Sequence, residues 1–409
     1  MEDSEPPPDF IPGSRIQLGP ALGSAAAARC LVRRLAAIEA AAPEGLDTLA
    51  PIAAAISEVS SDEALGVVWN DALPRIVDLV AEHGAAMGEQ TALYLFKLFV
   101  AAQHIGGVEE MLSAIRRGQH RDGYLWGDIF DQLLANRSLA LMVVESLDRC
   151  VPAGYCGVAY LEMANALMRE GALPEHPYDT PEGRERLRDL LLSTEDVWYA
   201  QSAAGSLPFV GGADQIELIT MARCHPLSEV RLEAARAAAA MGDLEALEVL
   251  AHHAANPVDA GTAIAYLQEL DSIDRLPIDV YDPAFQAQVA MVAWLSDPSE
   301  FGQPPAEVAV VDRRRLFWPP LNREIEVFLV RFVYDFPEVD ERATFIGMVG
   351  SVTAALLGEV DPETMDYADI YGMHCCWELE RMHDPRAPAV RSPQTGRRIL
   401  DLENPGAGF

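Results

Sequence analysis

The densest group of potential metal ligands lies in the segment MHCCWELERMHD, residues 373–384. Its ligand-bearing side chains are His374, Cys375, Cys376, Glu378, His383 and Asp384. On a helix, His374 and Glu378 are one turn apart and could share a metal ion. The two adjacent cysteines diverge by about 100° around a helix, so they cannot both bind the same ion.

We favour a different interpretation of this segment, in which Cys375 and Cys376 are small buried thiols that pack near Trp377. The reason is that no second pair of ligands elsewhere in the sequence completes a tetrahedral site. His374, Glu378 and His383 are therefore weak metal-ligand candidates. The sequence identifies no catalytic residue, and we expect no cofactor.

Two further segments have residues that occur in chemical sites. Residues 347–351 (GMVGS) have neither the GxGxxG spacing nor the GK[ST] ending of phosphate-binding loops. A bend or a close backbone approach in a small sheet explains these glycines better. Cys156 lies among glycines and aromatic residues without an identifiable histidine or acid as partner, which favours a packed thiol over a nucleophile.

Recurring start signals indicate that most of the chain before residue 296 is helical. Thr180, Asn256 and Asp282 each stand directly before a proline. A side-chain oxygen at this position accepts a backbone N–H of the first turn, and the fixed φ of proline suits the first helical residue. We therefore expect a helix to begin at each of these sites.

Glycines after apolar helical segments mark the predicted helix ends, because glycine readily adopts the left-handed conformation found there. They lie in segments 105–107, 210–212 and 241–243. Residues 233–243 align with residues 202–212 at an offset of 31 and with residues 262–272 at an offset of 29. A period near 30 residues in helix–turn–helix units is typical of a solenoid.

The clearest repeat is the stretch HPLSEVRLEAARAAAAMGDLEALEVLAHH. Its characteristic positions are Val230-Arg231, Ala234-Ala235, Met241-Gly242-Asp243 and the leucines that follow. The stretch resembles a HEAT repeat of the short kind, about 30 residues long, which includes the repeats of phycobilisome-lyase-like proteins. The resemblance is clearest over residues 195–275. It implies an α-solenoid scaffold with a concave surface for a partner, and repeats alone imply no chemistry.

The sequence changes character after Ser296. Prolines predict a linker over 297–305. Residues 323–336 (REIEVFLVRFVYDF) are aromatic and β-branched, which predicts a strand. Residues 343–360 predict a second strand that becomes helical near Val352.

The Asp361-Pro362 pair then predicts the start of a helix. The predicted fold is therefore mainly α, an α-solenoid of HEAT-like helix pairs (an α–α superhelix) with a small C-terminal α+β domain. The predicted parts are a disordered acidic tail (1–20), the solenoid (21–296), the linker (297–305), the α+β domain (306–385) and a loose tail (386–409).

Composition excludes several classes of partner. The 409 residues carry 63 acidic and 30 basic side chains, a formal net charge of −33. Such a chain repels phosphate backbones, so we expect no nucleic-acid partner. The N-terminus shows no secretory-signal pattern, and no uninterrupted run of about 18 apolar residues predicts a membrane span. We expect a cytoplasmic protein with no membrane partner.

These observations favour a non-enzymatic scaffold that binds another protein. If the acidic side chains gathered on the concave face, that partner would be basic. We favour the other arrangement, in which they coat the outer helices. Two alternatives from other classes are an enzyme or chromophore-handling protein of the lyase-like repeat branch, and an enzyme whose site lies in the C-terminal domain.

Overall fold

A computed structural model describes residues 25–42, 45–57, 62–147, 150–193, 196–212, 214–336 and 341–405. The chain divides between Ala237 and Ala238 into two compact units. It is mainly helical, with a four-stranded antiparallel sheet in its C-terminal part, which confirms the coarse prediction of the fold class. The predicted tail over 1–20 lies outside the described residues. No helix in the described ranges is long and apolar enough to cross a membrane.

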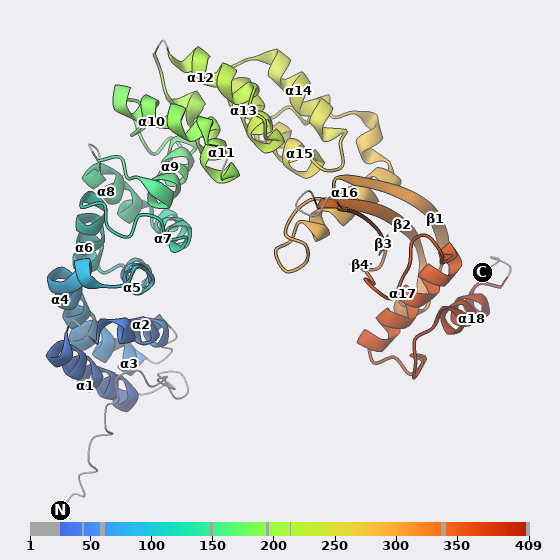
Figure 1. Ribbon diagram of the computed structural model, residues 1–409, viewed down its shortest axis with the longest axis horizontal. Helices are drawn as coiled ribbons and strands as arrows, with labels where there is room; N and C mark the ends of the chain where they lie inside the picture. The colour runs from blue at the N-terminus through green and yellow to red at the C-terminus, as the bar shows by residue number, and fades with distance from the viewer. Residues whose placement is uncertain are drawn as a thin grey trace, which may run out of the picture. The chain divides into compact units, whose positions relative to one another are not determined.

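The first unit consists of helices and their connections over its described residues (Figure 1). The helices are α1 (Ala25–Ala41), α2 (Leu49–Ser57), α3 (Asp62–Val67), α4 (Leu73–His83), α5 (Glu89–Ala101), α6 (Ile105–Arg116), α7 (Leu125–Leu134), α8 (Arg137–Leu147), α9 (Gly154–Arg169), α10 (Pro181–Leu192), α11 (Val197–Ser206), α12 (Asp214–Arg223) and α13 (Ser228–Ala240), which extends past the division. Helices α2, α5, α7, α9 and α11 contact one another in succession, and α4, α6 and α8 do the same. The helices therefore pack in two neighbouring rows.

Buried aromatic side chains join consecutive helices of the first row. The rings of Phe96 and Trp126 have centroids 5.8 Å apart, and those of Trp126 and Phe130 are also 5.8 Å apart. Phe130 then contacts Tyr160 at 6.1 Å, which links α7 to α9. Such ring pairs stabilise packing beyond the area they bury, so they fix the relative placement of α5, α7 and α9.

Two of the four predicted helix starts are confirmed. No helix begins at Asp361-Pro362, because the next helix, α17 (Tyr367–Arg381), starts after the Asp366 cap. The Thr180 side chain accepts a hydrogen bond from Gly183 N at 3.0 Å, and α10 begins at Pro181. Asp282 caps α16 (Pro283–Leu295) in the same way. The prediction at Asn256 is wrong, because α15 (Ala260–Glu269) begins four residues later and the Asn256 side chain bonds within its own turn.

Of the predicted helix ends, the one at 241–243 is confirmed and the one at 105–107 is wrong. Gly242 has φ +94°, and it separates α13 from α14 (Leu244–Ala254) as expected. Gly106 and Gly107 instead lie in the first turn of α6. A Cβ on Gly107 would lie 2.3 Å from the Phe99 ring, so this glycine permits close packing of α5 on α6 and does not end a helix.

The second unit places helices on both faces of a sheet (Figure 1). Its elements are α14, α15, α16, β1 (Glu307–Trp318), β2 (Arg323–Phe336), β3 (Glu341–Val349), β4 (Thr353–Ala355), α17 (Tyr367–Arg381) and α18 (Pro393–Glu403), with strand order β1-β2-β3-β4. Alternate residues of β2 face opposite sides, so Phe328 and Val330 pack against α16 while Val327 and Leu329 pack against α17. The strand predicted over 323–336 is confirmed.

The outer strand β1 pairs with β2 alone. Its register shifts by one residue between Val310 and Asp312, which is a β-bulge. Near its end, the Asn404 side chain accepts a hydrogen bond from Phe317 N at 2.7 Å and donates one to Phe317 O at 3.0 Å. Arg313 of this strand pairs with Glu326 of β2.

Three segments of the second unit differ from the sequence prediction. The expected linker over 297–305 packs on the sheet, where the Phe301 ring stacks on Tyr334 with centroids 4.6 Å apart. The chain after β3 does not become helical near Val352 but turns back as β4. The expected loose tail over 386–409 contains α18, which buries Leu400 and packs closely on α17.

Candidate functional site

A cavity of about 400 Å³ opens over α7, α9 and α11 in the first unit. We call it the acidic–aromatic pocket. Its aromatic lining is Tyr124, Tyr155 and Trp198, its carboxylates are Asp128, Asp131 and Glu162, and its remaining lining is Gly127, Val158 and Ala159. The rings of Tyr124 and Trp198 are 71% and 56% exposed, which is high for large aromatic side chains.

Helical spacing brings these side chains to one surface. Tyr124 immediately precedes α7, and Asp128 and Asp131 follow it at four and seven residues, which places all three on one face. On α9, Tyr155 and Glu162 are also seven residues apart. Sequence reasoning missed this site, although the same aromatic–acidic spacing on two helices was the signal for it.

The electrostatic field in the pocket is negative. Burial raises the pKa of the Tyr155 hydroxyl, and the carboxylates of Asp196, Asp128 and Asp131 raise it further. Each carboxylate disfavours the phenolate, because a second negative charge would be placed nearby. The shift therefore shows that acids from more than one element act on the same side chain.

Glu162 is half-buried in the wall of the pocket. Burial is the main reason that its pKa is raised, and the neighbouring Glu233 contributes in the same direction. The Ser202 side chain has the largest effect against that shift, followed by Arg169 and Arg236. A nearby cation stabilises the charged form of a half-buried carboxylate, because it compensates for the hydration that this form has lost.

A buried polar network lies next to Glu162. Arg236 Nε donates to Glu233 Oε1 at 2.9 Å. Asn165 Nδ2 donates to the Ser202 carbonyl at 3.2 Å, which joins α9 to α11. A Cβ on Gly205 would lie 2.8 Å from Glu233 Oε1. The absence of a side chain at this position of α11 therefore leaves space for the Glu233–Arg236 ion pair of α13.

One cation already lies at the edge of the pocket. Lys97 Nζ is 2.5 Å from Asp128 Oδ2, and both side chains are partly exposed. Lys97 is the chain's single lysine. Asp131, in contrast, forms no ion pair within the part of the chain that the structure describes. The pocket therefore keeps negative charge for a ligand after this internal contact is counted.

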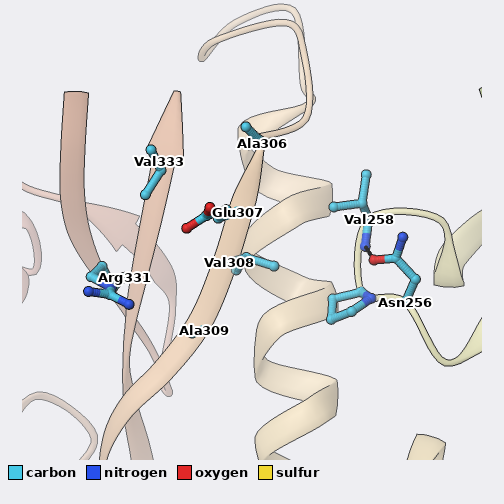
Figure 2. A pocket seen from close by; sticks show the side chains of 9 residues that line it. Asn256, Val258, Ala306, Glu307, Val308, Ala309, Arg331 and Val333 are labelled. Atoms are coloured by element: carbon cyan, nitrogen blue, oxygen red, sulfur yellow. Dashed lines mark hydrogen bonds between the residues drawn. The ribbon is translucent and has the colours of Figure 1, made fainter. Parts of the chain in front are cut away.

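A second cavity, of about 330 Å³, lies in the second unit between the turn after α14 and the start of β1 (Figure 2). Its walls are mainly aliphatic or backbone, including Val258, Val308 and Val333. Asn256 bonds to Asp259 and Glu307 pairs with Arg342, so the exposed Arg331 is the one charged lining side chain that has no ion pair among the described residues. This cavity therefore presents less unsatisfied charge than the acidic–aromatic pocket.

The sequence candidates for metal binding occupy different environments. His374 is fully buried, and neither of its ring nitrogens has a hydrogen-bond partner among the described residues; burial lowers its pKa to about 3. Glu378 accepts hydrogen bonds from Trp318 Nε1 at 3.0 Å and from Ser351 Oγ at 2.6 Å. His383 lies beyond the end of α17 and is exposed.

The described residues contain no group of three or more His, Cys, Asp or Glu side chains placed to hold a metal ion. Neither cavity is lined by His374 or Glu378. Cys375 and Cys376 are both buried, and burial raises the pKa of the Cys376 thiol to about 11, so this thiol is protonated at neutral pH.

The chain matches no protein-family model, no curated protein and no solved structure. The HEAT-like resemblance of residues 195–275 therefore stays a prediction that rests on the residues themselves.

Proposed function

We propose that this protein is a non-enzymatic scaffold of HEAT-like helix pairs, and that it binds a protein partner through a basic segment of that partner. The docking point is the acidic–aromatic pocket. This proposal combines the protein partner expected from the sequence with a specific surface of the first unit.

The observation that carries the proposal is the convergence of three aromatic rings and three carboxylates on one cavity. A cation over an aromatic face is attracted by the ring quadrupole, and the attraction reaches about 2 kcal/mol where water is excluded. Carboxylates beside the rings add a Coulomb term and supply hydrogen-bond acceptors. Basic side chains have the matching charge and donors.

The helix packing supports the scaffold part of the proposal. Successive contacts among α5, α7, α9 and α11 are the nearest-neighbour pattern that helical repeats use to bury their apolar faces. Such rows present side chains from several consecutive helices on one surface. The pocket draws on three successive members of this row, α7, α9 and α11.

The test is a titration of the full chain with a fluorescent hexapeptide of alternating arginine and lysine, followed by fluorescence anisotropy. A chain of net charge −33 attracts any basic peptide, so the decisive comparison is between variants of equal charge. Asp131→Asn changes the pocket, and Asp189→Asn removes the same charge from an exposed position on α10.

We expect Asp131→Asn combined with Trp198→Ala to weaken binding by about tenfold, which corresponds to about 1.4 kcal/mol. The Asp189→Asn variant should bind as the parent does, to within about twofold. Equal losses in the pocket variant and the Asp189 variant would show that only the overall charge attracts the peptide, and the pocket would not be the docking point.

A further inference from the structure

We propose that the acidic–aromatic pocket is an arginine site, which binds the guanidinium group of one arginine side chain in preference to an ammonium or a methylated ammonium. This inference rests on the proposed function and adds the chemical group that the pocket selects.

The two carboxylates that Lys97 does not hold come from different helices. Asp131 lies on α7 and Glu162 lies on α9, and both line the same cavity. A guanidinium carries five N–H donors fanned out in one plane, so it can donate to two carboxylates in different directions at once. A lysine ammonium concentrates three donors at one point and matches such a divided acceptor set less well.

The aromatic walls favour a flat cation. Tyr155 and Trp198 project from α9 and α11, and Val158 and Ala159 make the adjoining surface apolar. A guanidinium stacks on aromatic faces and is more weakly hydrated than an ammonium, so it loses less hydration when it enters such a space. A volume of about 400 Å³ is at the small end for ligand sites, which suits a single side chain.

The half-buried Glu162 carboxylate disfavours a quaternary ammonium. A carboxylate that has lost part of its hydration needs hydrogen-bond donors in exchange. A trimethylated ammonium has no N–H group, so Glu162 would keep only the Ser202 hydroxyl and Asp131 would gain no donor. An arginine side chain supplies those donors directly.

Lys97 fills the ammonium position that the pocket offers. Its Nζ contacts Asp128 at the partly exposed rim, while Asp131 and Glu162 stay available to a ligand. An incoming lysine would have to compete for Asp128 or use Asp131 and Glu162 alone. The geometry therefore separates the carboxylate that holds the chain's own ammonium from two carboxylates that a guanidinium can reach together.

The experiment uses four glycine–serine peptides that differ only in their central residue, which is arginine, lysine, trimethyllysine or citrulline. Each is titrated into the full chain by isothermal calorimetry. In parallel, reductive ¹³C-methylation labels Lys97, the chain's single lysine, so that one resonance at the rim reports ligand entry beside the N-terminal amine signal.

We expect the arginine peptide to bind about tenfold more tightly than the lysine peptide and to shift the Lys97 resonance. Its affinity should fall about tenfold in the Glu162→Gln variant and in the Asp131→Asn variant. Asp131 is exposed, so its variant keeps the test valid if Glu162→Gln does not fold. Asp189→Asn is again the matched control. The citrulline peptide, which is neutral, should not bind measurably.

Each other outcome is decisive. If the lysine or trimethyllysine peptide binds as tightly as the arginine peptide, arginine selection is overturned while the docking of basic segments stands. Binding of citrulline at the strength of arginine would also overturn it, since the charge would play no part. If none of the charged peptides binds, the proposed function fails together with this inference.

Discussion

The buried ion pair behind the acidic–aromatic pocket provides the sharpest test of how this unit is held together. The Glu233 and Arg236 side chains are 8% and 2% exposed, and both lie on α13. The substitution Arg236→Met keeps an unbranched apolar side chain but removes the guanidinium. It leaves the Glu233 carboxylate in the interior without its main cation.

Removing one member of a buried ion pair costs about 3–5 kcal/mol in unfolding free energy, because the remaining charge stays desolvated. For a unit of this size, the dependence of that free energy on urea is about 3 kcal/mol per molar. The midpoint of unfolding should therefore fall by about 1–2 M urea. Hydrogen exchange in urea, measured on peptides that contain α9 and α11, reports on this unit alone.

The double variant Glu233→Gln, Arg236→Met removes both charges and should recover most of the lost stability. Arg188→Met is the matched control, because Arg188 pairs with the exposed Glu185 and Glu217 on the surface and should matter little. A double variant as unstable as the single one would refute the reasoning, since the cost would then come from lost packing and not from an unpaired buried charge.

Three other outcomes follow from the structure. The raised pKa of Glu162 means that this carboxylate takes up a proton above the ordinary glutamate value of 4.5. Affinity for the arginine peptide should therefore begin to fall above pH 4.5 on acidification. Calorimetry across pH should show a weaker fall in the Glu162→Gln variant. Gly396→Ala should lower the free energy of unfolding, measured in urea, by about 1–3 kcal/mol, because the added Cβ would lie 2.2 Å from the backbone of α17. Gly261→Ala is the control: its Cβ would meet nothing within 4 Å, so this variant should be neutral or stabilising. Gly127→Ala should stabilise α7 by about 0.5–1 kcal/mol in the same assay and weaken peptide binding, because the new methyl group enters the pocket.

Local signals in the sequence predicted the elements whose structure is decided locally. The strand over 323–336 was found to the residue, because its aromatic and β-branched composition matches a strand covered on both faces. The caps at Thr180 and Asp282 were also correct, since a capping oxygen before a proline acts within one turn. Gly242 ended its helix for an equally local reason.

Predictions failed where tertiary contacts decide the structure. Phe301 lies in a proline-rich segment that looks like a linker, but its ring stacks on the sheet. Gly107 looks like a helix end, but it makes room for Phe99 of the neighbouring helix. The C-terminal α18 was missed because its place depends on the close contact between Gly396 and Gly372 of α17.

The candidate site was missed for a related reason. Its residues are polar and aromatic side chains at ordinary helix positions, and no contiguous motif joins them. Tyr124 at the start of α7, Asp131 on α7, and Tyr155 and Glu162 on α9 become a site only after these two helices pack side by side. A sequence supplies the face of each helix but not the partner that this face meets.

The outer strand β1 also bears on how the protein behaves at high concentration. Long open strand edges are where separate molecules join into fibrils. Here the bulge between Val310 and Asp312 breaks the edge into two short runs, and the Asn404 amide occupies both backbone groups of Phe317. Strand β2 lies between β1 and β3, and the β1 edge of the sheet is a poor template for amyloid growth.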